Sequence, residues 1–208
     1  MSEWMTPKDI TFAVDGCREP LSVYTTRPET IWGATFIILS PEHPLASVIT
    51  IAAQRDAVDA YLARAASLSD VEKSKERAKT GVFTGAYAIN PATGAPIPVW
   101  IADYVLRSYG SGAIMAVAAH DGRDHAFART FGLPIVGVIE GPKEGDIQQD
   151  AWEGDGRLAN SGALTGLDAL AAKKAAIAWI EEQGIGQCRT QYRLRDWLFS
   201  RQRYSYVS

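Results

Sequence analysis

The sequence predicts an α/β protein in which a closed or nearly closed β-barrel forms the core and a few helices surround it. Short segments rich in β-branched and aromatic residues, bounded by Gly, Pro and Asn turns, outnumber the segments with helical periodicity. The strands and helices do not alternate in a strict β-α-β-α order, and the chain has no internal repeat. Many short strands with only a few helices between them are typical of such barrels.

Eight segments have the composition of strands, and turn residues separate them. The run IVGVI is expected to be a buried strand because it is apolar throughout. The segment QCRTQYRL is the final expected strand and leads into an arginine-rich tail. The expected strands are 10–14, 21–26, 34–39, 81–90, 97–105, 112–118, 135–139 and 187–194.

Helices are expected at three places between the strands. The first lies around residues 57–65, where apolar residues recur at helical spacing. A second should begin near His120 and end at Gly132, and a third, amphipathic helix covers 167–184. The Gly- and Asp-rich stretch 140–156 should be an exposed loop.

The composition is that of a soluble globular protein with a real core, since hydrophobic residues make up 47% and charged residues 22%. No apolar run approaches the roughly 18–20 residues that span a bilayer, and MSEWMTPKDI lacks the basic start and apolar stretch expected of a signal peptide. Cys17 and Cys188 form no CxxC pair and cannot supply a cysteine-based zinc site. We therefore expect a reduced, cytoplasmic setting with no membrane partner.

The charge balance limits the kind of nucleic-acid partner. A net charge of −3 and a pI of about 5.6 argue against a protein that coats long stretches of nucleic acid, because phosphate contacts need many Lys and Arg. This net charge is compatible with a pocket that binds only the end of one nucleic-acid strand.

Residues 25–30, TTRPET, place three threonines around an arginine at the end of a strand. Pro28 fixes its own backbone and pushes Arg27 towards an extended conformation, so the segment is a rigid base for side chains. Threonine hydroxyls can donate to an oxyanion or position a water, and Arg27 can hold a phosphate or a ribose edge. The alternative is an ordinary Thr-rich strand that runs into a proline turn.

A second candidate segment combines small residues with acids. The glycines of 110–117 let another backbone or a ligand approach closely. Asp121 and Asp124 stand three apart where a helix should start, which resembles a capping box. A carboxylate there should stay ionised beside the helix N-terminus and suit a substrate ammonium group. Capping and substrate binding are compatible explanations.

Several other site types are not supported by the sequence. The three histidines, His43, His120 and His125, match no zinc-ligand spacing, so no metal is expected. A G-x-S-x-G nucleophile elbow, a P-loop and a G-x-G-x-x-G fingerprint are also missing. We therefore expect no cofactor.

Taken together, four motifs in order resemble the editing domain of leucyl-tRNA synthetases of the bacterial and organellar type. TTRPETIWGATF resembles its threonine-rich motif, and YRLRDWLFSRQRY resembles the segment that rejoins the synthetase core. Between them stand GVFTGAYAINPATGAPIPVWIADYVL and YGSGAIMAVAAHDGRDHAFA. One departure is Ala118, where the family usually has Pro. The resemblance implies that 1–208 is a single editing domain of the class Ia synthetase fold, with 193–208 the rejoining segment.

The resemblance also implies an activity and partners. The family hydrolyses the ester between a noncognate amino acid and the terminal adenosine of tRNA-Leu, after transfer, without a metal or a covalent intermediate. Norvaline, isoleucine and methionine are the expected amino acids. The partners would be the tRNA-Leu 3′ end and the rest of the synthetase. Boron-containing drugs target this pocket in the family as adducts with adenosine.

Site residues follow from motif position. Thr25 and Thr26 would orient the water or the carbonyl, and Asp124 would bind the α-ammonium group as the third catalytic residue. Thr30 would stand at the pocket floor and exclude leucine. Expected substrate-binding residues, besides Thr30, are Arg27 and Tyr109 at the adenosine end, Met115 and Val117 in the amino-acid pocket, and His120, Asp121 and Arg123.

Two alternative functions remain open from the sequence. The chain could be a valyl-type editing domain, although that type usually has GDTA where this chain has GATF at 33–36. It could also be a non-catalytic module that only docks the tRNA 3′ end. The intact Thr-rich and Asp motifs argue against this second alternative.

Overall fold

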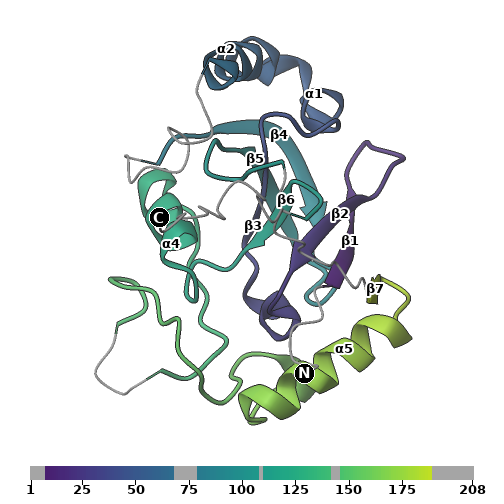
Figure 1. The fold of residues 1–208 in the computed structure, drawn as a ribbon, viewed down its shortest axis with the longest axis vertical. Helices are drawn as coiled ribbons and strands as arrows, with labels where there is room; N and C mark the ends of the chain where they lie inside the picture. Colours follow the sequence, from purple (N-terminus) through teal and green to yellow (C-terminus); the bar gives the residue numbers. More distant parts are fainter. Residues whose placement is uncertain (1–7, 68–78, 108–109, 142–145, 189–208) are drawn as a thin grey trace, which may run out of the picture.

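The computed structural model describes residues 8–67, 79–107, 110–141 and 146–188. A seven-stranded mixed sheet forms the centre of this part of the chain (Figure 1). Its strands are β1 (Lys8–Val14), β2 (Leu21–Thr25), β3 (Phe36–Leu39), β4 (Val82–Ile89), β5 (Pro96–Ile101), β6 (Ala113–Ala116) and β7 (Gly186–Cys188).

The sheet curves into a nearly closed barrel, as the sequence predicted. The strand order is β2-β1-β4-β5-β3-β6, and β7 pairs with β1 beside β4. β3 and β5 run parallel, whereas the other strand pairs in the described residues are antiparallel. β2 and β6, at the two ends of this order, contact each other. This contact brings together the segments that follow β2 and β6.

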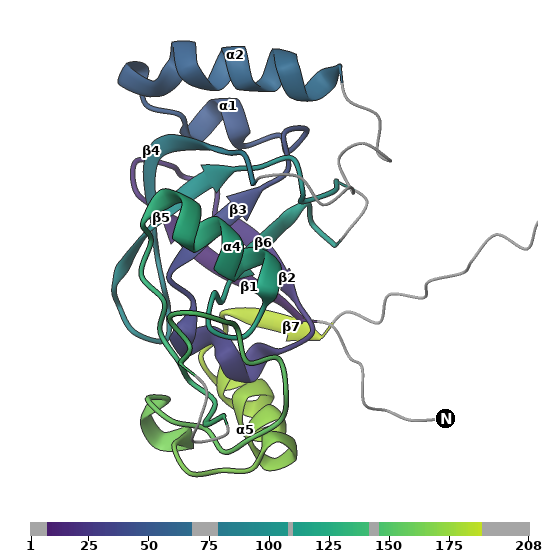
Figure 2. The same ribbon diagram turned by 90° about the vertical axis from the view of Figure 1, so that its left-hand side faces the viewer.

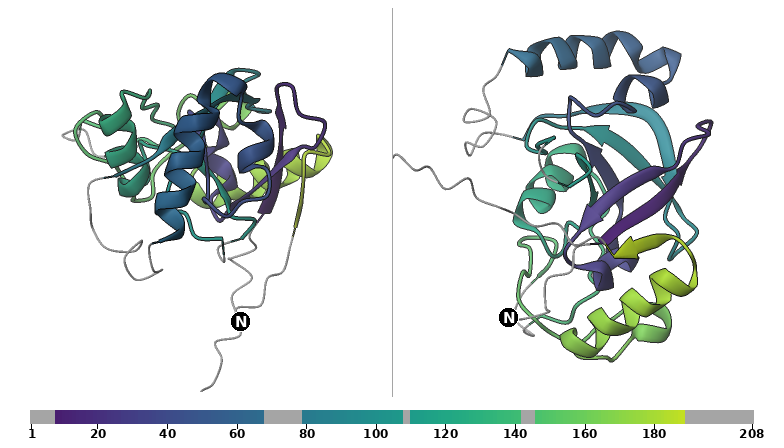
Figure 3. Two further views of the ribbon diagram at one scale, coloured as in Figure 1. Left: turned by 90° about the horizontal axis from the view of Figure 1, so that it is seen from above. Right: turned by 45° about the vertical axis from the view of Figure 1, so that its right-hand side comes forward.

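Helices cover the ends and one side of the barrel. α1 (Ala46–Ile49) and α2 (Arg55–Ala66) lie across one end, α5 (Ala169–Glu182) lies at the other, and α4 (Gly122–Phe131) packs on the side (Figures 2 and 3). Short 3-10 helices occur at η1 (Pro28–Gly33), η2 (Ala52–Gln54) and η3 (Gly162–Leu164). Within the described ranges, no helix has the length and apolar character needed to cross a membrane.

The barrel interior is filled by side chains that alternate along the strands. Ile10, Phe12 and Val14 of β1 all point inward and are buried, which is the period of two expected for a strand with one core face. A second apolar cluster joins the outer face of β3 to α4 through Phe36 and Phe127, whose rings stack at 5.6 Å. The barrel is therefore a packed scaffold on which the site residues are fixed.

The prediction of a strand at 135–139 is wrong. Only Ile139 forms a bridge, an isolated one to Leu158. The N–H groups of Val138 and Ile139 donate to the ring of His120 instead of to a neighbouring strand. The expected strand 97–105 ends earlier, at Ile101.

Several predictions fall partly or wholly outside the described residues. The final strand is observed over Gly186–Cys188, which confirms 187–188 of the predicted range, and the rest of that range, 189–194, lies outside. Tyr109 and the predicted rejoining segment 193–208 also lie outside the described residues.

Candidate active site

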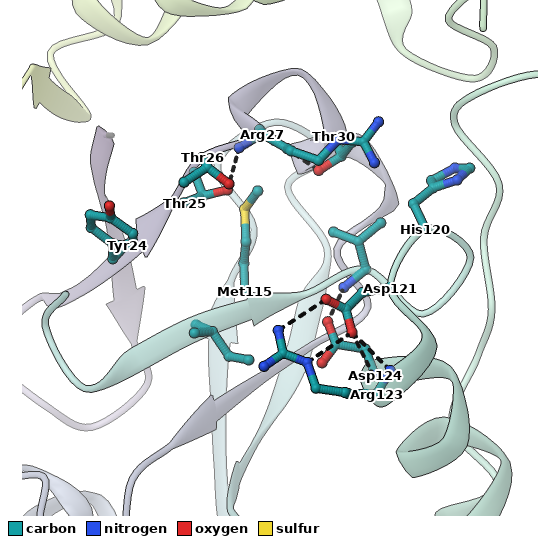
Figure 4. A pocket seen from close by; sticks show the side chains of 12 residues that line it. Tyr24, Thr25, Thr26, Arg27, Thr30, Met115, His120, Asp121, Arg123 and Asp124 are labelled. Atoms are coloured by element: carbon teal, nitrogen blue, oxygen red, sulfur yellow. Dashed lines mark hydrogen bonds and ion pairs between the residues drawn. The ribbon is translucent and has the colours of Figure 1, made fainter. Parts of the chain in front are cut away.

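The Thr-rich and Asp-containing motifs meet in one cavity of about 110 Å³ (Figure 4). One wall, which we call the threonine wall, comprises Thr25, Thr26, Arg27 and Thr30, at the end of β2 and in η1. The opposite wall, the aspartate wall, comprises Asp121, Arg123 and Asp124, at the start of α4. The remaining lining residues are Tyr24, Ile114, Met115, Val117 and His120.

Every expected site residue that the structure describes lines this cavity, although these residues are separated by up to about a hundred positions in the sequence. Tyr24 and Ile114 line it as well and were not predicted. In the structure, Gly110 has a φ of +62° and a Cβ there would collide with the Tyr24 side chain, but no pattern in the sequence pairs these two residues. Gly110 thus allows the close approach of a side chain, whereas the sequence led us to expect a backbone or a ligand there.

The threonine wall is held by local hydrogen bonds. The Thr25 hydroxyl accepts from the Arg27 N–H (3.0 Å), and the Thr30 hydroxyl donates to the Arg27 carbonyl (2.8 Å). Arg27 has φ −126° and ψ 64°, outside the helical region as Pro28 requires, although its ψ falls short of a strand. The Thr25 bond uses only a lone pair, so the hydroxyl hydrogen can still donate to a ligand.

Two further side chains support this wall. The Arg27 guanidinium donates to Glu29 Oε1 (3.3 Å), and Glu29 is buried. Asn90, fully buried in the turn between β4 and β5, donates to the Ile31 carbonyl (2.9 Å) and the Ala34 carbonyl (3.1 Å). Asn90 therefore ties η1, which carries Thr30, to the barrel. Asn90 is not recognisable from the sequence as part of the site, because a turn asparagine is ordinarily explained by the turn itself.

The aspartate wall contains the helix cap that the sequence predicted. Asp121 is the N-cap of α4 and accepts from the backbone N–H groups of Arg123 (2.8 Å) and Asp124 (3.2 Å). In a capping box, the side chain at the position of Asp124 would accept from the N–H of the N-cap residue, but the carboxyl group of Asp124 has other partners. Its Oδ2 accepts from the Val117 N–H (3.1 Å), and its Oδ1 accepts from the Tyr104 hydroxyl (2.9 Å).

The expectation that the helix N-terminus keeps Asp124 ionised is wrong for the ligand-free site. Asp124 is only 4% exposed. Burial, and then the negative charge of Asp121, raise the pKa of Asp124 to about 7, against the opposing hydrogen bonds from Tyr104 and Val117. Desolvation outweighs the helix dipole here because the whole carboxyl group is removed from water. A cation placed in the cavity would favour the charged form.

His120 lines the cavity, but backbone groups occupy both of its ring nitrogens. Nε2 accepts from the N–H groups of Val138 (2.9 Å) and Ile139 (3.0 Å), so Nδ1 carries the proton and donates to the Trp152 carbonyl (2.9 Å). Burial lowers the pKa of His120, the bond to Trp152 opposes this, and the charge of Arg27 lowers it further. The neutral ring therefore joins the turn before α4 to two distant loops.

The arrangement combines three chemical features. The carboxyl group of Asp124 can receive a cation, and the hydroxyls of Thr25 and Thr26 can donate to an oxygen or hold a water. Ile114, Met115 and Val117 add apolar surface for a side chain. No group of three or more potential metal-ligating side chains is found in the described part of the chain.

Comparison with known proteins agrees with this geometry. Residues 5–181 match the family model "Leucyl-tRNA synthetase, editing domain". The chain is 51% identical over 196 residues to a leucine–tRNA ligase of Elusimicrobium minutum, covering 94% of this chain and 23% of that protein. It is 56% identical over 194 residues to one from Roseiflexus castenholzii, covering 89% of this chain and 22% of that protein.

A solved structure supports the fold assignment. The agnB2 LeuRS of Agrobacterium radiobacter K84, crystallised as a ternary complex with tRNA and LeuAMS, superposes with a TM-score of 0.70 at 31% identity. The match covers 92% of this chain and 21% of that one. Fold and site thus define an editing domain of an aminoacyl-tRNA synthetase. The chain belongs to the leucyl-tRNA synthetase editing-domain family, and it spans less than a quarter of the curated relatives it matches.

Proposed function

We propose that this chain performs post-transfer editing, in which water hydrolyses the ester between a noncognate amino acid and the terminal adenosine of tRNA-Leu. The observation that carries the proposal is one cavity with the buried Asp124 on one wall and threonine hydroxyls on the other. An aminoacyl ester offers the matching groups, namely an α-ammonium, a carbonyl and an apolar side chain. Editing is needed because one methylene in an apolar pocket discriminates by only about 1–3 kcal/mol.

In the proposed reaction, Asp124 binds the α-ammonium group and thereby fixes the carbonyl carbon against the threonine wall. Thr25 and Thr26 hold the water or donate to the oxyanion that develops as the water attacks. Arg27 holds the adenosine end together with Tyr109. The proton of the attacking water goes in the end to the leaving ribose oxygen, and a substrate hydroxyl assists this transfer.

Thr30 is proposed as the residue that excludes leucine. An apolar pocket attracts leucine as strongly as its rivals, so refusal requires a steric block. Thr30 is suited to this because it is β-branched, is 2% exposed and has its hydroxyl anchored on the Arg27 carbonyl. Met115 and Val117 line the pocket for the accepted side chains. Asp121 and Arg123 shape the aspartate wall, and His120 supports it through its backbone bonds.

Further partners belong to the same proposal. The accepted amino acids are norvaline, isoleucine and methionine, and the whole chain 1–208 acts as a single domain joined through 193–208 to the rest of a cytoplasmic synthetase. A boron-containing compound that forms an adduct with the terminal adenosine would occupy the same cavity. The relatives that are full-length leucine–tRNA ligases support this setting.

The test is deacylation of three charged tRNAs by the purified chain. We expect hydrolysis of isoleucyl- or norvalyl-tRNA-Leu well above the buffer rate, with leucyl-tRNA-Leu and threonyl-tRNA-Val left intact. Preferential hydrolysis of threonyl-tRNA-Val would favour the valyl-type alternative. Binding of a terminal-adenosine analogue without hydrolysis of any charged tRNA would favour a docking module and overturn the proposal.

A further inference from the structure

Tyr104 is a partly buried neighbour of the aspartate wall for which the mechanism proposed above has no role. It follows β5 in the sequence, and its hydroxyl donates to Asp124 Oδ1 at 2.9 Å. The Val117 N–H donates to the other carboxyl oxygen at 3.1 Å. These two donors come from different segments and hold the two oxygens of one carboxyl group, which fixes the plane of that group.

We propose that Tyr104 is a positioning residue that acts through Asp124: its hydroxyl anchors the carboxylate at the cavity wall and favours the charged form over the neutral one. This inference rests on the proposed function, since the charged form is what a substrate ammonium needs. Each carboxyl oxygen keeps a second lone pair beyond the bond it already accepts. Asp124 can therefore bind Tyr104, Val117 and an ammonium group at the same time.

The electrostatic surroundings explain why such a donor matters. Asp121 stands beside Asp124 and disfavours its charge, whereas Arg123 favours it. The Lys79 ammonium lies 5.0 Å from the centre of the Tyr104 ring, on the ring face rather than at the hydroxyl. Burial raises the pKa of Asp124, and the Tyr104 hydrogen bond is the largest of the effects that lower this pKa. Without this hydroxyl, the neutral carboxyl group would persist to higher pH.

The packing of the ring makes a clean substitution possible. The Tyr104 ring contacts the Phe127 ring at 5.9 Å and belongs to the apolar cluster between the sheet and α4. Tyr104→Phe keeps these contacts and removes only the hydroxyl. A matched control is Tyr61→Phe, since the Tyr61 hydroxyl is also hydrogen-bonded, to Thr80 and to the Asp103 N–H, but does not contact Asp124.

The experiment records two readouts for the 208-residue chain, its Tyr104→Phe variant and its Tyr61→Phe variant. The first is the titration of the Asp124 carboxyl carbon by NMR, which needs no activity. The second is the pH dependence of kcat/KM for isoleucyl-tRNA-Leu. Tyr104→Phe should move both the titration and the acid limb upward by about one pH unit, because it removes one hydrogen bond to a charged group. Tyr61→Phe should move neither.

A uniform loss of rate at every pH, with the Asp124 titration unmoved in Tyr104→Phe, would overturn the inference and leave Tyr104 a merely structural residue. An equal shift in Tyr61→Phe would also overturn it, because the effect would then be general. Failure of the proposed function looks different. In that case the wild-type chain hydrolyses no charged tRNA, whereas the NMR titration still decides whether Tyr104 acts on Asp124.

Discussion

The threonine wall and the aspartate wall face the same cavity but are built in different ways. The hydroxyls of Thr25 and Thr30 are neutral, and each is bonded to the backbone of Arg27 within a few residues. Asp124 is a buried carboxyl group held by Tyr104 and Val117, which are 20 and 7 positions away. The hydroxyls of Thr25 and Thr30 are thus fixed by local backbone contacts, whereas the carboxyl group of Asp124 is held by contacts with other segments.

This difference predicts different consequences of mutation. A change on the aspartate wall should alter the reaction with every amino acid, because every substrate carries the same α-ammonium group. A change on the threonine wall at Thr30 should alter which side chain is accepted, because only the side chains differ between substrates.

The largest expected effect is that of Asp124→Ala. Loss of a charged partner in a closed site costs roughly 2–5 kcal/mol, which is about a 30- to several-thousandfold loss of kcat/KM. Deacylation of isoleucyl-tRNA-Leu by the variant, with circular dichroism to confirm folding, measures this. Near wild-type hydrolysis by a folded variant would remove Asp124 from the mechanism.

Asp124→Asn separates ammonium binding from general-base catalysis. Asn can keep both neighbours, since its oxygen can accept from Val117 and its amide can donate to the Tyr104 oxygen. A tRNA-Leu that carries the α-hydroxy analogue of isoleucine lacks the ammonium group. If Asp124 binds the ammonium, Asp124→Asn should slow isoleucyl-tRNA-Leu strongly and the hydroxy analogue little. Equal loss on both substrates would instead make Asp124 the general base.

The second effect concerns the threonine wall. Thr30→Ala should admit leucine, so that the variant hydrolyses leucyl-tRNA-Leu about 10- to 200-fold faster than the wild type does. This is the range of discrimination that one methyl or methylene group provides in an apolar pocket. Isoleucyl-tRNA-Leu should still be cleared. Rates with the two charged tRNAs measure the change.

Two further variants at Thr30 separate shape from hydrogen bonding. Thr30→Val keeps the branched shape and loses the bond to the Arg27 carbonyl, whereas Thr30→Ser keeps the bond and loses the methyl group. A steric block predicts that Val still spares leucyl-tRNA-Leu and that Ser hydrolyses it. If Thr30 is only a turn residue, Val should lower stability and all activities together while Ser behaves as the wild type.

The pH dependence should reflect the raised pKa of Asp124. Because this pKa is about 7 in the free site, kcat/KM should fall about tenfold per pH unit below that value. It should fall again above about pH 8, where an α-amino group loses its proton. An acid limb near the ordinary Asp value, 3.8, would contradict the burial argument.

The same pKa has a consequence for stability. Between about 3.8 and about 7, the folded protein holds a proton on Asp124 that the unfolded chain has lost. The free energy of unfolding therefore decreases as pH rises through this window, and the loss is complete above it. Asp124→Asn should raise the melting temperature relative to the wild type more at pH 8 than at pH 4.

The smallest effect is expected for Asp121→Ala. Loss of the N-cap should lower the free energy of unfolding by about 1 kcal/mol, measured by urea denaturation. Because Asp121 raises the pKa of Asp124, its removal should also move the acid limb of kcat/KM downward. Both changes are distinct from the loss of activity expected for Asp124→Ala. An acid limb that stays in place in Asp121→Ala would show that the charge of Asp121 does not act on Asp124.

The sequence predicted much of the fold because its signals are local. The Gly132 stop of α4, the Asp121 cap and the alternation in β1 each depend on residues close in the chain. The error at 135–139 has the opposite origin. Its apolar run is typical of a buried strand, but His120, some 18 positions earlier, takes the N–H groups that a neighbouring strand would have bonded.

The site was predicted as a set of residues but not as an electrostatic environment. The family resemblance assigned Thr25 and Asp124 to one site, and both line the same cavity. The raised pKa of Asp124 could not be anticipated, because it follows from burial that only the folded barrel creates, and then from the negative charge of Asp121. The role of Asn90 could not be anticipated either, since its partners, Ile31 in η1 and Ala34 just after it, lie more than fifty positions away.

The most direct test of the division between the two walls uses Thr30→Ala and two substrates. The kcat/KM values for isoleucyl- and leucyl-tRNA-Leu are measured from about pH 5.5 to about pH 8.5. If the threonine wall sets side-chain selection and the aspartate wall sets charge, the variant hydrolyses both, and the two profiles share one acid limb near pH 7. Leucyl-tRNA-Leu that stays intact, or two limbs at different pH values, would contradict this account.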